Sequence, residues 1–164
     1  MTRIHKITDY KGSARKFTCL ACAREKREVD LGDIVKSKYF DAHQDYEIPI
    51  PGTIIITSRR HIQSVDEFTK EEQLDFIDFL CQVRSALRKI LNIDVVYMYQ
   101  REDTSHHYHL CILPRYDWMT EKFGRKIGSV RSIVNYARKN LKIKREIEKT
   151  ENATKKLKQF FQEK

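Results

Sequence analysis

Apolar residues follow helical spacing most clearly between residues 69 and 91. The apolar stripe, interrupted by charged residues, consists of Leu74, Ile77, Cys81, Leu87 and Ile90. Thr69 and Glu72 precede the stripe with the spacing of a capping box, and Asn92 follows it as a stop signal. The pattern predicts one helix with a single buried face, in which Cys81 is an inert core thiol.

Short runs of β-branched and aromatic residues predict strands around this helix. Residues 53–57 read Thr-Ile-Ile-Ile-Thr, which indicates a strand covered on both faces. Residues 39–42 predict a shorter strand. Residues 94–100 and 105–113 predict an antiparallel pair joined by a polar connection.

The last part of the chain is strongly charged and predicts helix from about residue 129. The apolar residues of its first half form a docking stripe: Val130, Ile133, Val134, Ala137 and Leu141. Beyond Ile147 apolar residues are few, so we expect the end of the chain to pack weakly. Together these elements predict an α+β fold. We expect a domain over residues 1–128, in which an antiparallel sheet packs against the long helix, and a basic helical extension over residues 129–164.

Size and composition fit one globular domain. The 164 residues suffice for one buried core, and 40% hydrophobic with 34% charged residues is typical of a soluble protein. No apolar run reaches the roughly 18 residues that a membrane span needs, and the first residues have no secretory signal. Four cysteines without such a signal indicate a reducing compartment, where thiols bind metal or stay free. We therefore expect a cytoplasmic protein without a membrane partner.

Positive charge is concentrated at the C-terminal end. Residues 115–164 contain fifteen basic and six acidic side chains, which accounts for the whole net charge of +9, and residues 1–114 contain seventeen of each. A basic tail can steer an anionic substrate or bind nucleic acid. It can equally be a solvated, lysine-rich helix face.

The strand over residues 105–113 carries the strongest chemical signal. Alternate side chains of a strand share a face, so His107, His109 and Cys111 point one way. The residues that point into the core are then Tyr108, Leu110 and Ile112. The alternative is that the histidines are ordinary members of a hydrophobic strand whose polar atoms are satisfied locally.

A histidine in such a cluster is suited to covalent chemistry at phosphorus. The attacking imidazole nitrogen must be unprotonated, and a backbone carbonyl that accepts a hydrogen bond from the other nitrogen fixes that tautomer. Neighbouring donors then stabilise the phosphate oxygens. The candidates for this role are His107 beside His109 and the hydroxyls of Thr104 and Ser105.

These residues closely resemble the signature of the histidine triad superfamily, His-x-His-x-His followed by apolar residues and often Pro-Arg. The matching segment runs from His107 to Arg115. Pro51-Gly52, the strand after it and His61 also match a family segment in spacing, so the resemblance covers about residues 19 to 118. It implies a histidine-triad-like antiparallel sheet with the long helix packed on it. It also implies homodimers that pair through this helix and a neighbouring strand.

The resemblance further implies a nucleotide hydrolase or transferase that acts at the α-phosphorus. The expected substrates are dinucleoside polyphosphates such as diadenosine tetraphosphate, or nucleoside phosphoramidates. The middle histidine of the family carries the nucleotide covalently, and it corresponds to His109. A hydroxyl that contacts phosphate corresponds to Thr104. Arg115 either adds charge at the site or holds the strand end, and no organic cofactor is expected.

Two departures from the family pattern bear on activity. The third triad position is Cys111, a weak hydrogen-bond donor that binds phosphate poorly. The glycine-rich, asparagine-containing loop usual before the triad is replaced by residues 100–103. These changes keep a rival open, namely a nucleotide- or nucleic-acid-binding protein that has lost turnover. A third option is a nucleotidylyltransferase with a phosphate or sugar phosphate as acceptor.

A metal site is also predicted. Cys19 and Cys22 form a CxxC pair with the spacing of zinc ligands, and two histidines can complete a Cys2His2 set. The resemblance implies that these are His61 and His107, as in zinc-bearing relatives. Such a site would pin the N-terminal segment to the histidine strand. The alternative is free thiols, with His61 on the surface and His107 as a phosphate contact.

Overall fold

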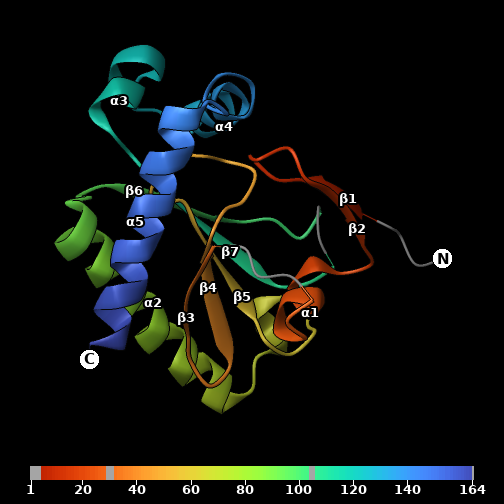
Figure 1. Cartoon of the computed structure of the whole chain (residues 1–164). Helices are drawn as coiled ribbons and strands as arrows, with labels where there is room; N and C mark the ends of the chain where they lie inside the picture. Colours follow the sequence, from red (N-terminus) through yellow and green to blue (C-terminus); the bar gives the residue numbers. More distant parts are fainter. Residues whose placement is uncertain (1–4, 29–31, 104–105, 164) are drawn as a thin grey trace.

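The computed structural model describes residues 5–28, 32–103 and 106–163 (Figure 1). Its centre is a five-stranded antiparallel sheet. In spatial order the strands are β3 (Asp33–Lys36), β4 (Phe40–Gln44), β5 (Ile54–Ser58), β7 (His109–Pro114) and β6 (Val96–Gln100). The predicted α+β class is therefore confirmed. Within the described ranges, no helix is both long and apolar enough to cross a membrane.

The strand predicted over residues 105–113 begins later than expected. β7 starts at His109, because residues 106–108 leave the ladder: the Tyr108 amide donates to the Ile62 carbonyl at 2.6 Å. Ser105, the first residue of the predicted strand, lies outside the described residues. The alternation of faces is as predicted. Tyr108 and Ile112 lie in the core, and His109 and Cys111 lie on the opposite face beside a cleft.

The elements before residue 37 were not predicted. They are a hairpin of β1 (His5–Thr8) and β2 (Ala14–Phe17), the short helix α1 (Leu20–Glu25), and β3 at the sheet edge. A 3-10 turn, η1 (Val65–Glu67), and the helix α3 (Asp117–Phe123) were also missed. All of these are short, and their patterns carry little periodicity.

The long helix α2 (Lys70–Leu91) has the predicted ends. The Thr69 hydroxyl accepts a hydrogen bond from the Glu72 amide, the Glu72 carboxylate accepts one from the Thr69 amide, and Asn92 adopts the left-handed conformation. The predicted buried stripe is wrong in its first half. Leu74 and Ile77 are 60% and 56% exposed, and Cys81 is an exposed thiol rather than a core one.

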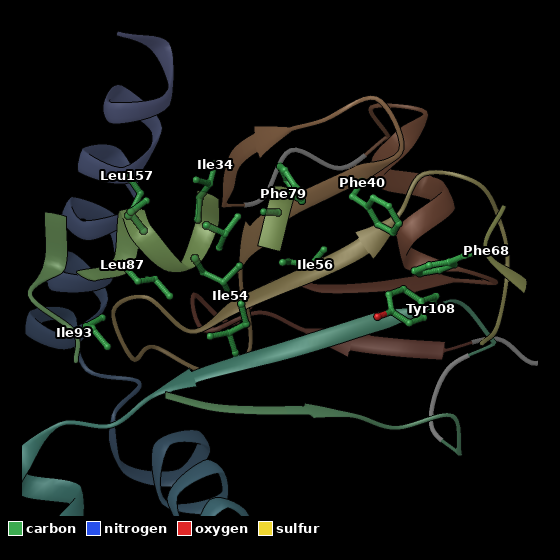
Figure 2. Packing of buried hydrophobic residues seen from close by; sticks show 14 of the residues in the cluster. Ile34, Phe40, Ile54, Ile56, Phe68, Phe79, Leu87, Ile93, Tyr108 and Leu157 are labelled. Carbon is green, nitrogen blue, oxygen red and sulfur yellow. The ribbon is translucent and has the colours of Figure 1, made fainter. Parts of the chain in front are cut away.

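α2 has a second apolar face, and this face packs against the sheet in place of the predicted one. Its buried apolar residues are Phe79, Val83, Ala86 and Leu87. They pack on Ile54, Ile56 and an aromatic group that includes Phe40, Phe68 and Tyr108 (Figure 2). Aromatic side chains remove more apolar surface from water than Leu74, Ile77 and Cys81 would.

The C-terminal segment forms two helices, α4 (Ser129–Asn140) and α5 (Lys144–Gln162). Ile133 and Ala137 dock α4 as predicted, against a second cluster at one end of the sheet. The expectation that the end of the chain packs weakly is wrong. Leu157 is fully buried and α5 lies along β3 and α2 (Figures 1 and 2), because the few apolar residues of α5 share one face.

Candidate functional site

Four predicted metal ligands come together where α1 meets the strand ends. The donor atoms of Cys19, Cys22, His61 and His107 all lie within 4.8 Å of one another. The Sγ of Cys22 is 3.1 Å from Nδ1 of His61, and the Sγ of Cys19 is 3.2 Å from Nδ1 of His107. Zinc bonds of about 2.0–2.3 Å place tetrahedral ligands roughly 3.3–3.8 Å apart. The two separations lie just below this range, so a small outward shift of the ligands would complete a tetrahedral Cys2His2 metal site.

His107 is held for ligation by its second nitrogen. Nε2 donates to the Ser58 carbonyl at 2.7 Å, which leaves Nδ1 bare toward the two thiols and His61. Such outer hydrogen bonds orient metal-binding histidines. His107 is 2% exposed and both its nitrogens are engaged. Its imidazole is therefore placed for metal rather than for phosphate.

The two thiols differ in acidity. Burial raises the pKa of Cys19, but its contacts with His107, the Cys22 amide and the Cys22 thiol outweigh burial and lower it to about 6. Burial and the neighbouring Cys19 raise the pKa of Cys22 to about 11. A thiolate already formed at Cys19 is the kind of ligand that a zinc ion requires.

His109 has the geometry of a nucleophile. Its Nδ1 lies 3.1 Å from the His107 carbonyl, to which the Nδ1 proton is donated, so Nε2 is left without a proton. Burial lowers the pKa of His109, which keeps the ring neutral. In the sheet His109 pairs with Thr57 of β5, so the backbone that carries it is fixed by the ladder. The alternative of locally satisfied strand histidines does not fit, because His109 borders a cleft.

The cleft beside His109 has a volume of about 800 Å³. Its floor is the face of the sheet opposite α2, with Thr57, His109 and Cys111 among the lining residues. The β1–β2 hairpin and α1 contribute residues to the lining, and so does α4. This is the size of site that takes a nucleotide-sized ligand.

Cys111 lies in the cleft as predicted, but its thiol is a weak group for phosphate. Burial and the nearby Asp45 carboxylate raise its pKa to about 12. The thiol is therefore neutral at physiological pH, and a neutral thiol donates only a weak hydrogen bond.

The other predicted substrate residues are Thr104, Ser105 and Arg115. Thr104 and Ser105 lie outside the described residues. Arg115 does not line the cleft; its Nε donates to the Thr120 hydroxyl at 2.9 Å and its amide to the Val95 carbonyl, so it holds the end of β7 to its neighbours.

Sequence reasoning missed two buried polar residues that line the cleft. His43 is 2% exposed and its Nδ1 lies 3.2 Å from the Asp41 carboxylate; burial and the charge of Arg24 lower its pKa to about 4. Asp45 accepts hydrogen bonds from the Glu47 and Ile48 amides, and burial raises its pKa to about 6. Little in the sequence signals either residue, because the same strand and turn also contain the polar residues Asp41, Gln44 and Glu47.

No family model matches the sequence, and no curated protein matches it. Solved structures do match its backbone. A zinc-bound histidine triad family protein from Mycobacterium smegmatis aligns with a TM-score of 0.61 at 16% identity, over 89% of this chain and 97% of that one. This chain has the histidine triad fold.

Two further structures agree. A protein of the histidine triad (HIT) family from Bacillus subtilis aligns with a TM-score of 0.55 at 20% identity, over 74% of this chain and 96% of that one. The diadenosine triphosphate hydrolase of Plasmodium falciparum aligns with a TM-score of 0.54 at 21% identity, over 83% of this chain and 80% of that one. The fold implied by the sequence motif, a histidine-triad-like sheet with a long helix, is thereby confirmed.

Proposed function

We propose that this histidine triad protein is a nucleotide hydrolase or transferase that attacks the α-phosphorus of its substrate with His109. The observation that carries the proposal is the hydrogen bond from Nδ1 of His109 to the His107 carbonyl, because it leaves Nε2 as a bare nucleophile beside the cleft. The expected substrates are dinucleoside polyphosphates or nucleoside phosphoramidates.

The reaction has two steps. Nε2 of His109 forms a bond to the α-phosphorus, and the bond from phosphorus to the leaving group breaks with its electron pair on the leaving group. Water, or a phosphate acceptor in a transferase, then attacks the same phosphorus, and the nitrogen–phosphorus bond breaks to restore the imidazole. His107 acts as a positioning residue in both steps through its carbonyl.

We propose that the Cys2His2 cluster holds a structural zinc ion. Bound zinc would supply no chemistry to the reaction but would fasten α1 to the residue that positions His109. The bare Nδ1 of His107 and the low pKa of Cys19 support this assignment.

The direct test of the reaction is chemical trapping. Protein mixed with diadenosine tetraphosphate and quenched rapidly should carry an adenylyl group on His109, located by peptide mass spectrometry. Product analysis with and without added phosphate separates hydrolase from transferase. The absence of both adduct and nucleotide release across several nucleotides would contradict the proposal.

One observation favours a second candidate, a nucleotide- or nucleic-acid-binding protein without turnover. The neutral Cys111 thiol stands at a triad position and gives the leaving phosphate little stabilisation. This candidate requires nucleotide binding without an adduct. If the basic helices α4 and α5 bind nucleic acid, the affinity falls steeply with salt.

For the enzyme, we expect replacement of Cys111 to have a small effect. Cys111→Ala should lower kcat/KM for diadenosine tetraphosphate by less than about tenfold, because a neutral thiol contributes at most a weak hydrogen bond. Steady-state kinetics measures this. A loss above about 100-fold would instead make the thiol a principal phosphate contact.

We also propose that two copies of the chain pair through α2. One side of α2 carries an exposed apolar stripe, formed by Leu74, Ile77 and Cys81 at positions i, i+3 and i+7. A helix stripe of this kind matches itself in a two-fold pair, and the motif resemblance implies pairing through the same helix.

The double variant Leu74→Glu, Ile77→Glu should be monomeric, because like charges then meet in the paired stripe. Light scattering after gel filtration gives the mass. Lys89→Glu changes the net charge by the same amount on an exposed part of the same helix and should remain dimeric. A monomeric wild-type protein would rule out the pairing.

A further inference from the structure

Arginines line the cleft beyond His109. Arg101 follows β6, and Arg131 and Arg138 lie on α4. The two α4 arginines are seven residues apart, which is two helical turns, so they face the same side about 10 Å apart. The lysines of α4 and α5 that give the tail its charge are not among the cleft-lining residues.

The register of the sheet places Arg101 next to His109. β6 pairs Tyr99 with Cys111 and ends on the pair of Gln100 with Leu110, so Arg101 is the next residue after β6 and His109 is the next of the opposite strand. Side chains alternate along a strand, and Arg101 therefore shares the cleft face with Tyr99.

Arg101 and Arg131 differ from Arg138 in their partners. Nη2 of Arg138 lies 2.6 Å from the Glu47 carboxylate, so its charge is matched by a neighbour in the same wall. No ion pair of Arg101 or Arg131 exists among the described residues, and both side chains are exposed at the cleft. Two unmatched guanidinium groups in a nucleotide-sized cleft attract phosphate oxygens, which they bind with two parallel hydrogen bonds.

We propose that Arg101 and Arg131 bind the phosphates of the leaving group and select substrates whose leaving group carries two or more of them. The inference rests on the proposed function and assigns its specificity. At the third triad position the Cys111 thiol provides no charge that could stabilise the departing phosphates. The guanidinium groups of Arg101 and Arg131 provide this stabilisation instead. Through α4, the C-terminal segment thus forms one wall of the cleft.

The test compares two substrates that share the attacked phosphorus. Attack at the α-phosphorus of diadenosine tetraphosphate releases ATP, a leaving group with three phosphates. Attack on adenosine 5′-phosphoramidate releases ammonia, which has none. Arg101→Gln and Arg131→Gln should each lower the ratio of kcat/KM for the first substrate to that for the second by about 10- to 100-fold. Lys139→Gln, an exposed charge on α4 away from the cleft, is the matched control and should keep the wild-type ratio.

Inorganic tripolyphosphate provides a second readout. It should inhibit turnover of the phosphoramidate by the wild-type protein, and the inhibition should weaken in the two variants. Ratios within twofold of wild type, with unchanged inhibition, would overturn the arginine assignment while leaving His109 chemistry intact. A wild-type protein that turns over neither substrate would overturn the proposed function itself.

Discussion

Replacing His109 with alanine is expected to abolish the adenylyl adduct and to lower kcat/KM by at least about 1,000-fold. The loss is large because the other histidines that line the cleft do not fit the role. Both nitrogens of His107 are engaged, His43 is only 2% exposed, and the exposed His106 has no hydrogen bond in the described part of the chain that fixes its tautomer. Rapid-quench mass spectrometry and steady-state kinetics give the two readouts.

The control for this variant is His106→Ala. His106 also lines the cleft, but it is exposed and makes no hydrogen bond within the described part of the chain that would leave one nitrogen bare, so the variant should still form the adduct on His109. A thermal melt of His109→Ala that matches wild type excludes misfolding as the cause. An adduct on the His109→Ala protein, or undiminished turnover, would remove His109 from the mechanism.

Loss of the metal is expected to be the second large effect. Protein purified without chelator should contain about one zinc ion per chain by elemental analysis. The double variant Cys19→Ser, Cys22→Ser should contain nearly none. We expect the free energy of unfolding to fall by at least about 3 kcal/mol, a part of the ~10–16 kcal/mol with which structural zinc binds in small metal-dependent domains.

The geometry explains why the loss should be that large. α1 is short, and Cys19 and Cys22 hold it against His61 and His107, which come from distant segments of the chain. α1 also places the buried side chain of Arg24 beside Asp41. This buried ion pair therefore depends on the position of α1.

Cys81→Ser is the matched control for the metal, because it removes an exposed thiol outside the cluster. It should keep the zinc content and the unfolding midpoint of the wild type. Denaturant unfolding checks the stability independently of activity. If the wild type purified in this way contains no zinc, or if loss of both cysteines leaves its stability unchanged, the cluster is a pair of free thiols near two histidines.

Features that depend on neighbours in sequence were predictable. The capping box at Thr69 and the stop at Asn92 are local hydrogen-bond and backbone preferences, and α2 has the expected ends. The alternation that places His109 and Cys111 on the cleft face follows from the two-residue period of a strand. The motif, with its ordered companions, indicated the fold.

Features that depend on competition between surfaces were not predictable. α2 has two apolar faces, and the sheet selected the one with Phe79 over the one with Leu74. Periodicity counts apolar residues but does not measure the surface that each face can bury. For the same reason the burial of Leu157 at the end of α5 could not be predicted from the sparse pattern around it.

The sequence by itself determined which side chains of one strand are candidates for the chemistry and how they alternate along it, because such relations are set within a few residues by backbone geometry. The resemblance implied that Cys19 meets His107, and the structure brings the two together. Tertiary structure alone decided that Arg101 and Arg131 share a cleft with His109, and that Arg115 does not. These groups are separated by up to 88 residues along the chain, and only the pairing of β6 with β7 and the packing of α1 and α4 on the sheet bring the right ones together.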